Sequence, residues 1–228
     1  MRRRVLAVGA HPDDVILGAG GYLLQLRAWG HEVSLLTMSS GGLAGDRAVR
    51  EKEELAAARL CGFDVEFARL NDGLVVFKAA VDCIEAAIDR VAPELVLTHS
   101  PADTHQDHET IARATVAACR PVPSVYTYEG PSSTSFQPTM TVDCAATWDR
   151  KMAALDCYPT QMSRRPYIAW ANAVSSYRAW PRHIGSQCEA FAAIRHDPHT
   201  YPGAGTDLLS DLMTTGAHAK AMAHAEGF

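Results

Sequence analysis

Short apolar runs alternate along the chain with longer segments whose apolar positions recur at helical spacing. The apolar runs are typical of buried strands: RRVLAVGA, EVSLLTM, VEFARL, ELVLTHS and SVYTY. The helical segments follow them in turn: GYLLQLRAWG, DRAVREKEELAAARLCG, AAVDCIEAAIDRVAP and DHETIARATVAACRP. Asp46 is a candidate N-cap for the second helix and Gly62 its stop, while Pro93 ends the third. This alternation predicts an α/β fold with a mostly parallel sheet and helices on both faces.

The pattern weakens after about residue 130. TMTVDC predicts an edge strand and ATWDRKMAALDCY a helix, whereas residues 159–183 are expected to form an aromatic loop region punctuated by prolines. In the Gly/Ala/His-rich tail, only TDLLSDLM suggests a helix. We expect a single domain over 1–228, with its core at about 4–191 and a C-terminal extension at 192–228.

The composition of the chain argues against some classes of binding partner. The chain has 228 residues, 47% of them hydrophobic, and its net charge of -5 comes without a basic stripe, which argues against nucleic acid. No apolar run approaches the roughly 18 residues of a membrane span, and the start MRRR lacks a signal-peptide core, so we expect a cytoplasmic protein with no membrane partner. The six cysteines form no C-x-x-C pair and are expected to be reduced thiols. A homo-oligomer is compatible with these features.

Three loops at the predicted carboxyl ends of strands carry the candidate chemistry: AHPDD, SSGGLAGD and HSPADTHQDH. The first stands where a G-x-G-x-x-G phosphate loop would lie. With Gly9 as its first glycine, however, the later glycine positions hold His11 and Asp14. A carboxylate there would repel a pyrophosphate, which argues against dinucleotide binding.

The imidazole and carboxylate side chains of these loops are better suited to bind a cation than a pyrophosphate. His11 and Asp14 are three residues apart across Pro12, and HQDH adds His105, Asp107 and His108. Two histidines and one carboxylate leave positions open for water and substrate, which is typical of a catalytic metal site.

Each of these residues also has a simpler interpretation. An aspartate at a helix start, such as Asp13 or Asp14, is more often an N-cap when considered alone. We expect His99 to support the site rather than bind the metal, and HDPH at 196–199 to lie away from it, in the irregular tail.

AHPDDVILGAGG, followed about ninety residues later by HQDH, resembles the LmbE-like or PIG-L family of metal-dependent de-N-acetylases, which act on N-acetylglucosaminyl conjugates. Further landmarks follow in order over about residues 4–191: SSGG, REKEELAAARLCG, LNDG, FQPTMTVD and KMAALDCYPTQ. The resemblance implies a Rossmann-like fold and zinc held by His11, Asp14 and His108. It also implies Asp13 as general base, with His105 as electrophile and acid, oriented by Asp107.

The chemistry of these residue types agrees with those roles. A carboxylate beside a metal-bound water can take its proton, and an imidazole opposite the metal can stabilise an oxyanion. Arg50, Ser40 and Gly41 lie where a sugar hydroxyl could be bound, although the helix could equally present Arg50 to solvent. Many relatives carry a glutamate just after HPDD, where this chain has Val15 and Ile16, so the contacts made by that acid are in question here.

The expected substrate is a small-molecule amino-sugar conjugate, because no hydrophobic anchor in the sequence argues for a lipid. Zinc is the expected cofactor, with Fe²⁺ or another divalent ion as the alternative, since all accept imidazole and carboxylate ligands. Other functions remain open: an iron redox enzyme, an amidase for a non-sugar N-acyl compound, and a non-catalytic binding module. Iron oxygenases usually place this ligand set on a β-jelly roll, so the strand–helix alternation favours hydrolysis.

Overall fold

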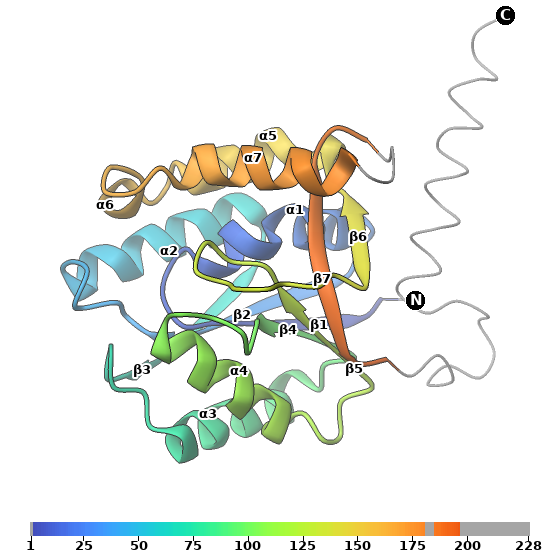
Figure 1. Ribbon diagram of the computed structural model, residues 1–228. Helices are drawn as coiled ribbons and strands as arrows, with labels where there is room; N and C mark the ends of the chain where they lie inside the picture. The colour runs from blue at the N-terminus through green and yellow to red at the C-terminus, as the bar shows by residue number, and fades with distance from the viewer. Residues whose placement is uncertain (1, 181–184, 197–228) are drawn as a thin grey trace, which may run out of the picture. The chain divides into compact units, whose positions relative to one another are not determined.

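The computed structural model describes residues 2–180 and 185–196, which contain a seven-stranded sheet of order β3-β2-β1-β4-β5-β7-β6 (Figure 1). The strands are β1 Arg4–Gly9, β2 Glu32–Ser39, β3 Asp64–Leu70, β4 Leu95–His99, β5 Ser124–Tyr128, β6 Met140–Asp143 and β7 Cys188–Arg195. Neighbours among the first five strands pair in parallel, whereas β7 runs antiparallel to β5 and β6. The predicted α/β class with a mostly parallel sheet is confirmed.

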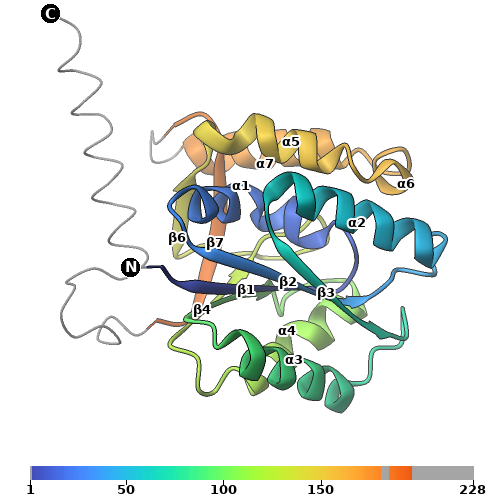
Figure 2. The same cartoon turned by 180° about the vertical axis from the view of Figure 1, so that it is seen from behind.

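Helices cover both faces of the sheet (Figures 1 and 2). They are α1 Asp14–Ala28, α2 Arg47–Cys61, α3 Phe77–Val91, α4 Gln106–Ala118, the 3-10 turn η1 Ala145–Thr147, α5 Trp148–Leu155, α6 Pro159–Met162 and α7 Tyr167–Ala179. One face carries α3 and α4, and the other carries α1, α2, α5 and α7. Every residue of β4 is buried, as its unbroken apolar run requires. Within the described ranges, no helix is long and apolar enough to cross a membrane.

Local sequence signals set several helix boundaries. The Asp46 side chain accepts a hydrogen bond from the amide of Val49 at 3.0 Å and so caps α2, which ends at Gly62 in the left-handed region with φ 75°. Helix α3 ends at Val91, two residues before Pro93. These predictions are confirmed.

The first helix begins earlier than its apolar pattern indicates. It starts at Asp14, directly after the HPDD turn, and runs through the glycine-rich segment. A Cβ on Gly18 would lie 2.3 Å from the Tyr128 ring, so the glycine lets α1 pack closely against β5.

The expectation of a loop over 159–183 is wrong, because α6 and α7 lie within that range. Pro159 and Pro166, which suggested a loop, stand at the starts of the two helices, where a missing amide proton costs no hydrogen bond. Strand β7 was not predicted from the sequence, although the edge position of β6 was. The sheet and its compact unit extend to Arg195. The suggested helix at TDLLSDLM and most of HDPH lie outside the described residues.

A buried ion pair ties α5 and β7 to the middle of α1. Lys151 Nζ lies 2.7 Å from Glu189 Oε1, and the two side chains are 2% and 3% exposed. Lys151 also donates to the carbonyl of Leu17 at 2.7 Å. The Glu189 carboxylate accepts the amides of Gly21 at 2.7 Å and Tyr22 at 2.8 Å, so its charge is compensated from three sides.

We expect Glu189→Ala to lower the free energy of unfolding by about 3–5 kcal/mol, because it leaves the ammonium of Lys151 buried without its counter-ion. Urea unfolding measures the change. Lys78→Ala, which breaks the exposed pair with Asp82, is the control and should leave the midpoint nearly unchanged. The double variant Lys151→Met/Glu189→Leu should recover most of the loss, since it removes both charges. A loss below about 1 kcal/mol for Glu189→Ala would contradict this account.

Candidate metal centre and active site

The HPDD turn between β1 and α1 holds Asp13 in a strained conformation. Asp13 has φ 97°, a region that residues other than glycine rarely adopt. It stands at the N-cap position of α1, but its side chain makes no capping hydrogen bond. The Asp14 carboxylate turns back instead and accepts the amide of His11 at 2.8 Å. A simple capping role therefore does not explain Asp13.

Two buried side chains of α2 hold this turn in place. Arg50 donates to the carbonyl of Pro12 at 2.8 Å, and Glu54 accepts the amide of Asp13 at 3.1 Å. The hydroxyl of Tyr158 also donates to Glu54, at 2.7 Å. Burial raises the pKa of Glu54, and that of Tyr158 is raised by burial and by the nearby Glu54 charge. The strained conformation of Asp13 is thus stabilised by hydrogen bonds from residues outside the turn.

Arg50 of α2 and two residues of the SSGG loop, Ser40 and Gly41, were predicted to bind substrate, and in the structure they contact one another and the HPDD turn or α2. Arg50 is 3% exposed and donates to the carbonyl of Gly41 at 3.0 Å as well as to Pro12. A Cβ on Gly41 would lie 1.7 Å from Arg50 Nη1, so only glycine fits. Ser40 is buried and donates to Glu51 at 2.5 Å. These contacts show that the three residues stabilise the local structure. Their predicted hydrogen bonds to a sugar hydroxyl stay a prediction.

Asp14 is the centre of the site. Its Oδ2 lies 3.3 Å from His11 Nδ1, 3.5 Å from His108 Nε2 and 3.3 Å from His99 Nε2. Burial acts to raise the pKa of Asp14, but these imidazoles hold it well below its usual value. The carboxylate is therefore ionised and lies among imidazole nitrogens from the HPDD turn and from the segment at the end of β4 and the start of α4.

His108 is oriented from behind by a carboxylate. Its Nδ1 lies 3.3 Å from Asp103 Oδ2 and 3.3 Å from Ser132 Oγ, so its Nε2 faces Asp14. Asp103 also accepts the amide of His105 at 2.9 Å. Although burial opposes it, these contacts lower the pKa of Asp103 to about 2. A carboxylate behind a histidine is the usual partner of a metal-binding imidazole.

His11 has the same arrangement with different acids. Its Nε2 lies 3.0 Å from Asp72 Oδ1 and 3.4 Å from Asp107 Oδ2, on the side away from Asp14. Burial acts to lower the pKa of His11, yet Asp107, Asp14 and Asp72 together raise it well above the ordinary value. The carboxylates that stabilise a proton on His11 would also attract a metal cation.

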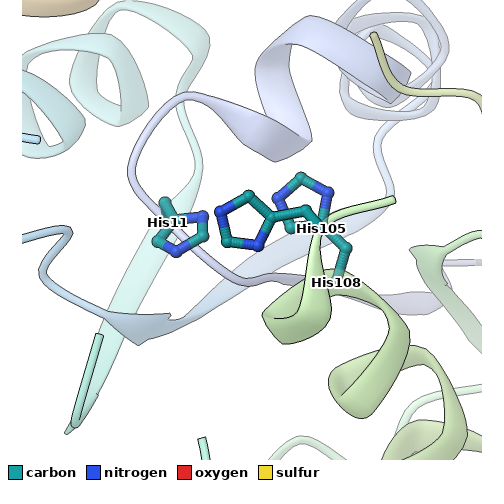
Figure 3. Close-up of side chains that lie close together, drawn as sticks. All are labelled: His11, His105 and His108. Carbon is teal, nitrogen blue, oxygen red and sulfur yellow. The ribbon is translucent and has the colours of Figure 1, made fainter. Parts of the chain in front are cut away.

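His105 lies beside His11 and His108 (Figure 3), with ring centroids 4.9 Å and 4.5 Å away. Its Nδ1 accepts the amide of Asp107 at 3.3 Å and so caps α4. In the neutral ring this assigns the proton to Nε2. Burial, followed by the nearby His108 and His11, lowers the pKa of His105.

The expected link between His105 and the Asp107 carboxylate takes another form. That carboxylate accepts the amides of Gly73 at 2.7 Å and Val75 at 3.3 Å and approaches His11. The backbone amide of Asp107, rather than its side chain, orients His105. At the start of a helix, an aspartate can orient a neighbouring side chain through its backbone amide or through its carboxylate, and the sequence does not show which of the two acts.

His99, the last residue of β4, also contacts the centre, and its expected supporting role stays a prediction. Its Nε2 accepts the amide of Ala10 at 2.9 Å, which occupies the lone pair that a metal would need. Its ring stacks on His108 with centroids 4.0 Å apart and is 2% exposed. Burial lowers its pKa to about 4, so it is a neutral ring at physiological pH.

Several groups of donor atoms around His11 and Asp14 could hold a metal ion, although the predicted set of His11, Asp14 and His108 is not itself one of these groups. Three overlapping groups have ligand atoms within 4.8 Å of one another: His11/His105/His108, Asp14/His99/His108 and His11/Asp72/Asp107. The predicted ligands His11, Asp14 and His108 are divided between the first two groups. Tetrahedral zinc with bonds of about 2.1 Å places its ligand atoms about 3.4 Å apart. The His11–Asp14 and His108–Asp14 contacts, at 3.3 and 3.5 Å, match that spacing.

Comparison with known proteins shows which family the chain belongs to. The PIG-L family, described as GlcNAc-PI de-N-acetylase, matches residues 6–119, which include both the HPDD and HQDH motifs. The chain belongs to this family. It is accordingly an enzyme of the hydrolytic N-deacetylase type.

The chain is similar to several individual proteins, which differ in the activities that their names give. The uncharacterized deacetylase YaiS of Escherichia coli is 35% identical over 150 residues, or 60% of this chain and 80% of that protein. The 4-oxalmesaconate hydratase of Pseudomonas putida is 26% identical over 195 residues, 70% of this chain and 74% of its own. The crystal structure of TT1542 from Thermus thermophilus superimposes with a TM-score of 0.75 at 26% identity, covering 88% of this chain and 100% of TT1542. The fold is thus shared along most of the chain.

Sequence reasoning missed four contributors to the site. They are Glu54, Asp72, Asp103 and Tyr158. Asp72 belongs to the LNDG turn, and Asp103 precedes HQDH, so both lay at predicted strand ends where polar residues were already of interest. Glu54 and Tyr158 lie inside segments with helical patterns, and only the tertiary structure brings them to Asp13.

We expect Tyr158→Phe to reduce kcat several-fold with KM and metal content unchanged. The substitution removes one donor from the buried Glu54 carboxylate, a contact of about 1.5–3 kcal/mol, and loosens the strained amide of Asp13. Steady-state kinetics and metal analysis measure the effect. Tyr177→Phe, at an exposed tyrosine of α7, is the matched control. Lower stability with full kcat would mean that Tyr158 serves the fold alone.

Proposed function

We propose that the protein is a zinc-dependent hydrolase that removes an N-acetyl group from a small amino-sugar conjugate. The observation that carries the proposal is the spacing of His11 Nδ1 and His108 Nε2 around Asp14, with the strained Asp13 next to them. The family description, a de-N-acetylase of an N-acetylglucosamine conjugate, supports the amino-sugar substrate.

His11, Asp14 and His108 would hold the metal. A bound divalent cation supplies Lewis-acid polarisation of the amide carbonyl and a water of lowered pKa. Among the imidazoles, His99 is less suitable, because the single lone pair of its Nε2 already accepts the amide of Ala10. The α/β scaffold favours zinc over iron, because iron oxygenases usually place this ligand set on a β-jelly roll.

Asp13 is the proposed general base. It is adjacent to a metal ligand, and its carboxylate lies 3.5 Å from Arg50 Nη2, which fixes its direction. Burial and the charge of Asp14 raise its pKa, opposed by Arg50. A raised pKa makes the carboxylate a stronger proton acceptor for the attacking water.

His105 is the proposed donor to the carbonyl oxygen as negative charge develops. With Nδ1 engaged by the Asp107 amide, Nε2–H is available, and the side chain is half-buried. A neutral imidazole can donate this hydrogen bond, as can an imidazolium. Asp107 is assigned a positioning role through His11 and the β3–α3 loop.

The hydratase among the relatives activates water for a different acceptor, so the amide bond is the feature to test. Amine release from N-acetylglucosamine and its glycosides, assayed with defined metal loading, separates deacetylation from hydration, from redox chemistry and from a non-catalytic module. An N-acyl compound without a sugar distinguishes a general amidase. Absence of amine release from every compound, with metal bound, would overturn the proposal.

We expect Asp13→Asn to retain the metal and to lose most hydrolysis, by about 10²-fold or more, since an amide cannot take the proton from water. Asp14→Asn is the matched neighbour and should lose metal affinity as well as activity. Metal analysis after dialysis and the amine-release rate measure the two effects. If Asp13→Asn stays within a few-fold of the parent, Asp13 is not the base.

We expect His105→Ala to lower kcat by about 10²- to 10³-fold with metal content unchanged, as for loss of one oxyanion donor. Asp107→Ala should lower activity less. Because the Asp107 amide that orients His105 survives this change, the two losses should be nearly additive in the double variant. A double variant no slower than His105→Ala would show that the Asp107 carboxylate acts through His105 after all. Loss of metal from His105→Ala would make His105 a ligand.

A further inference from the structure

The loop between β5 and β6, residues 129–139, contacts the histidine side of the site from behind. The Ser132 hydroxyl lies 3.3 Å from His108 Nδ1, the ring nitrogen that faces away from the proposed metal. Ser133 donates to Asp103 Oδ2 at 3.3 Å, and the same oxygen lies 3.3 Å from His108 Nδ1. Two consecutive serines of this β5–β6 loop therefore support His108, one directly and one through Asp103.

The backbone of the loop also pairs with the segment that leads into α4. The amide of Thr104 donates to the carbonyl of Ser132 at 3.1 Å. The next pair, Asp103 and Ser133, forms an antiparallel bridge. Because the Asp103 carboxylate accepts the amide of His105 at 2.9 Å, a shift of the loop would disturb the supports of both histidines of HQDH.

Arg178 of α7 joins the two ends of this loop. Its Nε and Nη2 donate to the carboxylate of Glu129 at 2.8 and 2.6 Å, a bidentate pair at the start of the loop. Nη2 also donates to the carbonyl of Phe136 at 3.4 Å, toward the other end. The Arg178 and Glu129 side chains are each 16% exposed, so solvent screens the pair less than a surface ion pair. One guanidinium thus connects both ends of the segment that carries the two serines.

The loop has little apolar packing of its own. Pro131, Thr134 and Ser135 are exposed, and Ser135 has φ 51°. Phe136, which is 8% exposed, is the large apolar side chain of the segment. Exposed polar segments with few buried apolar contacts open locally at a low cost in free energy. The contacts of Arg178 are therefore expected to determine how firmly the serines are held.

We propose that Arg178 is a positioning residue for the metal centre and acts on His108 through the β5–β6 loop. An imidazole whose outer nitrogen is held in place presents its other nitrogen to the metal in a fixed orientation, and groups that do this raise metal affinity. This inference rests on the proposed function, because it takes His108 as a metal ligand.

Calorimetric titration of the metal-free chain with zinc tests the proposal without requiring turnover. We expect Ser132→Ala, which removes a direct partner of His108, to weaken zinc binding by about 10-fold, and Arg178→Gln by about 5- to 10-fold. In the double variant, the combined loss should be clearly smaller than the product of the two single losses, because both changes act on His108 through one loop. Arg178→Lys keeps the charge beside Glu129 but not the planar fork, so its loss should be smaller, about 2- to 5-fold.

Arg27→Ala is the matched control. Arg27 also donates to two backbone carbonyls, those of Gly62 at 2.8 Å and His31 at 3.3 Å. These contacts lie just before β3 and β2 begin, at the edge of the sheet opposite the site. The control should leave the zinc affinity unchanged, and urea unfolding of every variant shows how much of each effect is general loss of stability.

Parent-like zinc affinity in both Arg178 variants, whatever their stability, would overturn the proposal, since Arg178 would then serve the fold alone. Losses that multiply fully in the double variant would also overturn it, because Arg178 would not act through the loop. If Arg178→Gln does not fold, parent-like affinity of Arg178→Lys is sufficient to reject it. Amine release is measured separately: a parent that binds zinc but releases no amine contradicts the proposed function and leaves the zinc comparison valid. A parent that binds no zinc would overturn both.

Discussion

The carboxylate of Asp14 is the contact on which the site depends. It lies within 3.5 Å of nitrogens from His11, His99 and His108, which come from two loops far apart in sequence. Those loops follow β1 and β4, which are neighbours in the sheet and pair in parallel. Because parallel strands present their carboxyl ends at one edge, the sheet order itself brings HPDD and HQDH together. The side chains of the two motifs are then close enough to contact one another.

The strained turn at Asp13 explains why α2 belongs to the site. A residue other than glycine at φ 97° costs of order 1–3 kcal/mol, and the surrounding structure must stabilise it. Arg50 and Glu54 do so by binding the carbonyl of Pro12 and the amide of Asp13, each from a buried position. They are one helical turn apart on α2, so one face of that helix contacts both ends of the Pro12–Asp13 segment. This arrangement holds Asp13 in its strained conformation, in which the side chain does not cap α1.

Much of this arrangement could be predicted from local pattern. The apolar runs fixed the parallel strands, and Asp46 and Gly62 marked the ends of α2, because capping is a short-range interaction. The clustering of acids and imidazoles at strand ends indicated a metal site. The hydrogen bonds of Glu54 and Tyr158 could not be predicted, since 104 residues separate them and each lies in a segment whose pattern indicates only a helix. Strand β7 was missed for a similar reason: it joins the sheet between β5 and β6 through pairings distant in sequence.

The electrostatics of the site favour a resident cation. Five aspartates lie on loops or first turns around four imidazoles, and Arg50 contacts one of these acids, Asp13. The acids are Asp13, Asp14, Asp72, Asp103 and Asp107. Burial, followed by the charge of Asp14, raises the pKa of Asp13. Against the effect of burial, the nearby carboxylates raise the pKa of His11 and the nearby imidazoles lower that of Asp14. A divalent cation would replace protons at the centre of the cluster. Metal binding is then coupled to proton release and to the stability of the HPDD turn, because the same carboxylates and imidazoles take part in all three.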